Sequence, residues 1–109
     1  PDLYSRVVSY LRQNLHEAEL TMAQIANAHH VSPRTISRVF AAHGTTPMNC
    51  VWQERLLSCR RALAEGKARN ITQVALDHGF SDMSHFSLAF RKAFGYTPSS
   101  LLRQTEASR

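Results

Sequence analysis

A pattern of small, polar and aromatic residues occurs twice in this chain, and the second copy follows the first after about 49 residues. The positions that correspond at this spacing are Gln24 and Gln73, Ile25 and Val74, Ala26 and Ala75, His29 and His78, Val31 and Phe80, and Ser32 and Ser81. The helix-ending segment Gly44–Pro47 corresponds to Gly95–Pro98, which lies 51 residues later. Two further matches, Ile36 with Phe86 and Phe40 with Phe90, require one residue to be inserted in the second copy. The chain is therefore expected to build one unit twice.

Both copies are divided by residues that typically start and stop helices. Thr21 and Gln24 form a capping-box pattern, and Asn70 with Gln73 repeats it. The remaining predicted N-caps are Ser32, Thr46, Ser81 and Thr97. Asp82 would follow the Ser81 cap in the first turn of its helix, where a carboxylate is favourable. Glycines 44 and 95 suit the left-handed conformation that ends a helix. These signals and the helical spacing of apolar residues predict helices at about 2–15, 22–29, 33–43, 47–65, 70–78 and 82–94 and from 98 onward.

Each copy reads as a short helix, a tight turn and a second helix. A small residue on the first helix, Ala26 or Ala75, lets the second cross closely, as in a helix-turn-helix. We expect an all-α, homeodomain-like, duplicated fold of seven helices, with lobes at residues 1–46 and 67–109 and a linker helix at 47–66. That helix would be roughly 30 Å long, close to the ~34 Å turn of B-DNA, so two lobes could occupy successive major-groove segments.

The composition favours a polyanionic partner. In a chain of 109 residues, 13 Lys and Arg against 8 Asp and Glu give a formal net charge of +5, which suits nucleic acid or an anionic membrane surface. No apolar run approaches the about 20 residues that a membrane span needs, and no signal-peptide pattern opens the chain. We expect a cytoplasmic protein with no membrane partner. A disulfide is excluded, because Cys50 and Cys59 lie about 13 Å apart along one predicted helix.

The second helix of each unit carries the candidate binding residues. Arg34, Ser37 and Arg38 would face outward in the first unit, where an arginine fork can bond guanine O6 and N7 together. The outward set of the second unit is Met83, Ser84, Ser87 and Leu88. Such a face offers thymine-methyl contacts and serine hydrogen bonds, so it should read bases more weakly. Candidate contacts to the DNA backbone are Ser32, Thr35, Ser81, His85 and Arg91.

The stretch "ITQVALDHGFSDMSHFSLAFRKAFGYTP", supported by "SPRTISRVF" and "RLLSCRRAL", resembles the DNA-binding domain of the AraC/XylS family of bacterial transcription regulators. The resemblance covers about Leu3 to Arg103. It implies a two-lobed domain that binds double-stranded promoter or operator DNA and regulates transcription through contact with RNA polymerase. It also implies a missing N-terminal effector-binding or dimerisation domain. The chain departs from the family pattern at Leu88, where the family commonly has arginine, and at His30, where the first turn often has glycine. The helix before Gly44 is also one residue short, and "SSLLRQ" replaces the usual aromatic-arginine ending after Pro98.

Other classes of function find less support. Six histidines are present without HExxH or CxxC spacing, and the carboxylates are scattered, so we expect no metal site, no cofactor and no enzymatic activity. Trp52, Leu56, Cys59 and Leu63 are expected to form a core stripe. Met83 and Leu88 could be ordinary exposed apolar residues instead of base contacts. The best competing hypothesis is a helical protein-protein interaction module with only non-specific DNA affinity.

Overall fold

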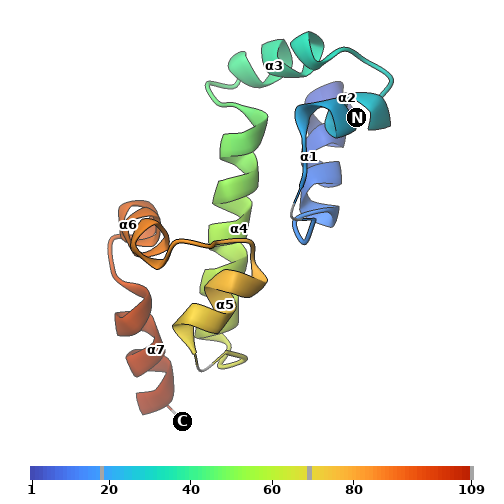
Figure 1. Cartoon of the computed structure of the whole chain (residues 1–109). Coiled ribbons are helices and arrows are strands. Elements are labelled where there is room, and N and C mark those ends of the chain that lie inside the picture. The colour runs from blue at the N-terminus through green and yellow to red at the C-terminus, as the bar shows by residue number, and fades with distance from the viewer. Residues whose placement is uncertain (18, 69, 109) are drawn as a thin grey trace. The chain divides into compact units, whose positions relative to one another are not determined.

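A computed structural model describes residues 1–17, 19–68 and 70–108, and within these ranges the chain forms helices and no strand (Figure 1). The helices are α1 (Leu3–Gln13), α2 (Met22–Ala28), α3 (Pro33–Ala41), α4 (Pro47–Ala64), α5 (Ile71–Asp77), α6 (Met83–Phe94) and α7 (Pro98–Ala107). The predicted all-α fold of seven helices is confirmed. Position 18 of the predicted first lobe and positions 69 and 109 of the second lie outside the described residues.

The contacts divide the chain into a first unit, Pro1–Glu54, and a second unit, Arg55–Arg109. The boundary falls inside α4, so the predicted division into two lobes and a separate linker stays a prediction. In the first unit, the buried residues are Val7, Leu11, Leu20, Ile25, Ala26, Ile36, Phe40 and Val51. In the second unit, the buried apolar residues are Leu56, Cys59, Leu63, Val74, Ala75, Phe80, Phe86, Phe90 and Leu101. Each unit thus packs its own core.

The helix starts follow local side-chain chemistry. The capping box at α2 is confirmed, because the Gln24 N–H donates to Thr21 Oγ1 at 3.2 Å and the Thr21 N–H donates to Gln24 Oε1 at 2.9 Å. At α5 the box is only half formed. Asn70 Oδ1 accepts the Gln73 N–H at 3.0 Å, but the Gln73 amide turns forward to donate to Asp77 Oδ1 at 2.8 Å.

The predicted cap of α6 was wrong by one residue. Helix α6 begins at Met83, and its N-cap is Asp82, whose Oδ1 accepts the His85 N–H at 3.1 Å. In the first unit the equivalent bond joins Ser32 Oγ to the Thr35 N–H at 3.2 Å. The inserted residue of the second copy therefore lies in the turn, and it moves the cap from Ser81 to Asp82.

The predicted core stripe on α4 is confirmed for Leu56, Cys59 and Leu63, which are at most 3% exposed. Trp52 is only partly buried, because it borders an open depression at the start of α4. Burial raises the pKa of the Cys59 thiol to about 12. The thiol donates a hydrogen bond to the Val74 carbonyl oxygen, with 3.9 Å between sulfur and oxygen. Both cysteines are free, and Cys59 serves as a small core residue.

Candidate nucleic-acid interface

The turns before α3 and α6 have the same backbone design. In the first, His30 adopts a φ of 56°, and the Val31 N–H donates back to the Ala26 carbonyl at 3.1 Å. In the second, Gly79 has a φ of 91°, and the Phe80 N–H donates to the Ala75 carbonyl at 2.9 Å. The sequence repeat is thus repeated in backbone geometry, and His30 takes the left-handed conformation that usually favours glycine.

A histidine ends the first helix of each motif. His29 Nδ1 lies 2.8 Å from the Ile25 carbonyl oxygen, and His78 Nδ1 lies 2.7 Å from the Val74 carbonyl oxygen. In each case the ring nitrogen can donate to a carbonyl in the last turn of the helix, and the Val74 carbonyl also accepts the His78 N–H at 3.2 Å. The alignment of the two copies in the sequence placed both histidines at equivalent positions but did not predict this contact. The signal that could have suggested it is that each histidine lies four residues after its acceptor.

The outer face of α3 carries the predicted base-reading residues of the first unit. Ile36 and Phe40 are fully buried, so helix α3 is held in the core by one side. Arg34, Ser37 and Arg38 are exposed on the other. Within the described part of the chain, neither guanidinium forms an ion pair with a carboxylate. Both arginines are therefore available to an external acceptor.

Two hydroxyls lie at the N-terminal end of α3. Ser32 Oγ accepts the Thr35 N–H, and the two side-chain oxygens lie 3.0 Å apart. Ser32 is exposed and Thr35 is half-buried. These groups are predicted phosphate contacts, and the helix end adds favourable polarity for an anion.

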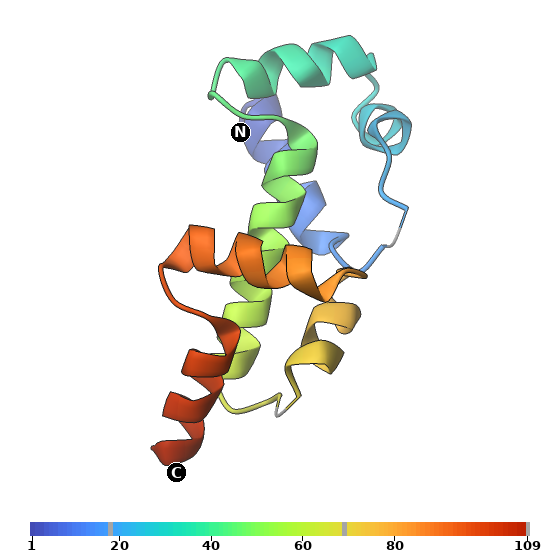
Figure 2. The ribbon, with the colours of Figure 1, turned by 60° about the vertical axis from the view of Figure 1, so that its left-hand side comes forward.

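Helix α6 is held in the same way as α3 but presents different chemistry. In Figure 2 it is the orange helix that follows the turn after α5. Phe86 and Phe90 are fully buried, and Leu88 is 71% exposed. Met83 is half-buried, so less of its surface is free than predicted. The exposed set also includes Ser81, Ser84, His85, Ser87 and Arg91.

Charge is distributed unevenly along α6. The carboxylate of Asp82 caps the first turn, whereas Arg91 and Lys92 lie in the last turn. No lysine or arginine lies between Met83 and Leu88. This half of the helix can offer two serine hydroxyls and apolar surface to a ligand, without an arginine fork.

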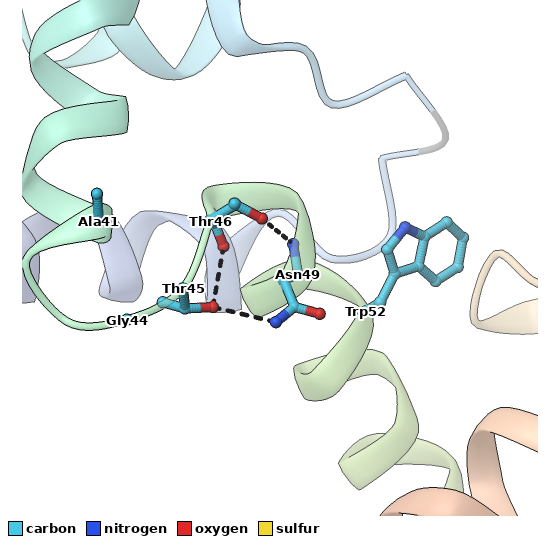
Figure 3. A pocket seen from close by; sticks show the side chains of 6 residues that line it. All are labelled: Ala41, Gly44, Thr45, Thr46, Asn49 and Trp52. Carbon is cyan, nitrogen blue, oxygen red and sulfur yellow. Dashed lines mark hydrogen bonds between the residues drawn. The ribbon is translucent and has the colours of Figure 1, made fainter.

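The depression at the start of α4 is lined by Ala41, Gly44, Thr45, Thr46, Asn49 and Trp52 (Figure 3). Its polar groups already bond one another, since the Asn49 N–H donates to Thr46 Oγ1 and the Asn49 amide donates to Thr45 Oγ1. Among the described residues, no three metal-ligating side chains gather, and no helix is long and apolar enough to cross a membrane.

Comparison with known families matches residues 25–104 to a family described as a helix-turn-helix domain. The XylDLEGF operon transcriptional activator of Pseudomonas putida is 38% identical over 104 residues, which are 93% of this chain and 32% of that protein. The transcriptional activator NphR of a Rhodococcus species is 40% identical over 94 residues, covering 86% of this chain and 28% of that protein. The chain thus spans about a third of the length of these relatives.

Two solved structures are similar to this chain over most of its length. A probable AraC family transcriptional regulator from Rhodopseudomonas palustris superposes with a TM-score of 0.86 at 28% identity, over 94% of this chain and 95% of that one. A transcriptional regulator with an AraC-type DNA-binding domain from Chromobacterium violaceum gives a TM-score of 0.84 at 32% identity, over 94% and 90% of the two chains. Both bear the name of the AraC family or domain type that the sequence motifs resemble.

Proposed function

This chain belongs to the AraC/XylS family of helix-turn-helix domains, and we propose that it is the sequence-specific DNA-binding part of a bacterial transcription activator. The family consists of DNA-binding regulators and not of enzymes. The observation that carries the proposal is the exposed pair of arginines, Arg34 and Arg38, which form no ion pair with any described residue and lie on a helix that follows a duplicated turn.

In the first unit, α3 would lie in the major groove of double-stranded DNA. Arg34 and Arg38 lie one helical turn apart, so each fork can address its own base. Ser37 lies between them on the same face and can bond a neighbouring base edge. Ser32 and Thr35 would bond phosphates at the helix start and fix the register of the helix on the duplex.

In the second unit, α6 would enter the next major-groove segment and discriminate less. Met83 and Leu88 would contact thymine methyl groups, and Ser84 and Ser87 would bond base edges. The backbone contacts would come from Ser81, His85 and Arg91. Only the arginine among these brings a charge that attracts a phosphate at every pH.

The longer protein would add functions that this domain lacks. Its relatives are about three times as long, and we propose an N-terminal domain that binds an effector or dimerises, in a cytoplasmic protein that contacts RNA polymerase at the promoter. The alternative of a protein-binding helical module is not favoured, because the relatives are transcriptional activators.

Selection of bound sites from a randomised duplex of about 25 base pairs, with competitor DNA at near-physiological salt, tests the proposal. Two preferred blocks about 10 base pairs apart are expected, with the block read by α3 more sharply defined. One block would mean that the second unit grips only the DNA backbone. No enrichment by a folded sample would refute sequence-specific reading and would favour the protein-binding module.

A further inference from the structure

One charged side chain is buried in the described part of the chain. Arg55 on α4 is 5% exposed, and its neighbour Leu56 and Cys59 one turn later are buried with it. Desolvation by burial lowers the pKa of the Arg55 guanidinium. Every buried side-chain nitrogen and oxygen atom of the described residues has a hydrogen-bond partner, so this guanidinium is retained in the core with its polar groups satisfied.

The guanidinium of Arg55 lies directly against the turn between α5 and α6. A Cβ built on Gly79 would lie 3.1 Å from Nη1, 3.2 Å from Cζ and 3.4 Å from Nε of Arg55. The plane of the side chain therefore packs on the backbone at Gly79, where φ is also positive. In the first unit the left-handed turn residue is His30, whose side chain is exposed and has room. The close approach of a guanidinium belongs to the second turn.

This turn determines where α6 begins. The Gly79 N–H donates to the Leu76 carbonyl, and only three residues separate Gly79 from Met83, the first residue of the helix. A shift of the turn would move the Asp82 cap and, with it, Met83 and Ser84. The first turn of α6 carries half of the predicted base contacts of the second unit.

From this packing we propose that Arg55 is the positioning residue of the second reading helix: its planar guanidinium fixes the turn at Gly79 and thereby sets the register of α6 on DNA. The inference rests on the proposed function, since it assigns a role in the binding of the second block. Arg55 acts through the turn and does not itself contact DNA. A lysine would keep the charge but not the plane that packs on the backbone.

The test uses Arg55→Met, which keeps a long apolar side chain, with Arg61→Met as the matched control. Arg61 lies on the same helix but is exposed, so its loss removes the same charge without touching the turn. Affinity is measured for the selected duplex and for duplexes in which either block is scrambled, at a temperature where circular dichroism shows each variant folded. For Arg55→Met, discrimination at the second block should fall by about tenfold while the first block is read as before. Arg61→Met should keep discrimination at both blocks.

Amide hydrogen exchange of the free proteins gives a second measurement that needs no DNA. In Arg55→Met, the amides of residues 79–85 should exchange about tenfold faster or more, while those of α3 stay unchanged. Arg55→Lys should show the same pattern more weakly. Gly79→Ala alone should speed amide exchange in the turn, because its new methyl group would meet the Arg55 guanidinium. Adding Arg55→Met should reverse part of this effect, because it removes the guanidinium atoms.

The outcomes separate the two ideas. If the native chain selects no sequence, the proposed function fails, and the exchange experiment still decides whether Arg55 fixes the turn. Suppose that the native chain reads two blocks, that folded Arg55→Met discriminates bases in both blocks as the native chain does, and that its amides at residues 79–85 exchange at the native rate. The positioning role of Arg55 is then wrong. Equal loss at both blocks by folded Arg55→Met would also overturn it, because the effect would not be local to α6.

Discussion

Arg38 is exposed on α3 and unpaired within the described residues, one turn after Arg34. If it reads a guanine, Arg38→Ala should cost about 1–3 kcal/mol on the preferred site and relax the preference at one position only. Binding to the native site and to single-base variants of the first block measures this. Ser37→Ala, which removes a hydroxyl from the same face, should lower the affinity less than Arg38→Ala does. An equal loss on every sequence would make Arg38 a phosphate contact instead.

Arg91 lies in the last turn of α6, beyond the predicted base contacts. A phosphate contact carries no sequence information, so Arg91→Ala should weaken binding to all duplexes alike. The slope of log affinity against log salt should fall in magnitude by about one, because one fewer counterion is released. Titrations at several salt concentrations give the slope. An unchanged slope would remove Arg91 from the contact surface.

The starts of the helices decide how the reading faces are presented. Asp82 caps α6 through the His85 N–H, whereas Ser81 precedes the cap. Asp82→Ala should therefore destabilise the protein by about 1 kcal/mol, and Ser81→Ala should change its stability little. Asn keeps an acceptor oxygen, so Asp82→Asn should retain most of the stability. Chemical denaturation of the three variants provides the comparison, and a larger effect of Ser81→Ala would contradict the assigned cap.

Local signals in the sequence predicted most of the helices. Thr21, Ser32 and Thr97 cap helices as expected, because a cap depends on residues three positions away. The cap of α6 was missed, since Ser81 and Asp82 are both good caps and only the backbone of the longer turn selects between them. Arg55 was missed for a different reason. Its burial depends on packing against Gly79, which lies 24 positions along the chain, and no local pattern reports that contact.

The candidate site was predictable to a similar extent. Periodicity placed Arg34, Ser37 and Arg38 on the exposed side of α3, since one face of a helix must be buried. It did not predict that Met83 would be half-buried, because the first turn of a helix packs on whatever precedes it. The base and backbone contacts themselves stay predictions, since they depend on a duplex.

The whole chain combines a net charge of +5 with two units that each contain a predicted reading helix. The charge alone predicts affinity for any duplex, while the duplicated motif predicts a preferred sequence in two parts. Helix α4, which has 18 residues, contributes residues to both units.

The most direct test of this account is the affinity for a selected two-block duplex before and after about five base pairs are inserted between the blocks, which is half a turn of DNA. If one chain reads both blocks with α3 and α6, the insertion should lower the affinity to that of a duplex with a single block. Inserting the same length outside the blocks should change nothing. An affinity that is unaffected by the insertion between the blocks would contradict simultaneous reading by the two units.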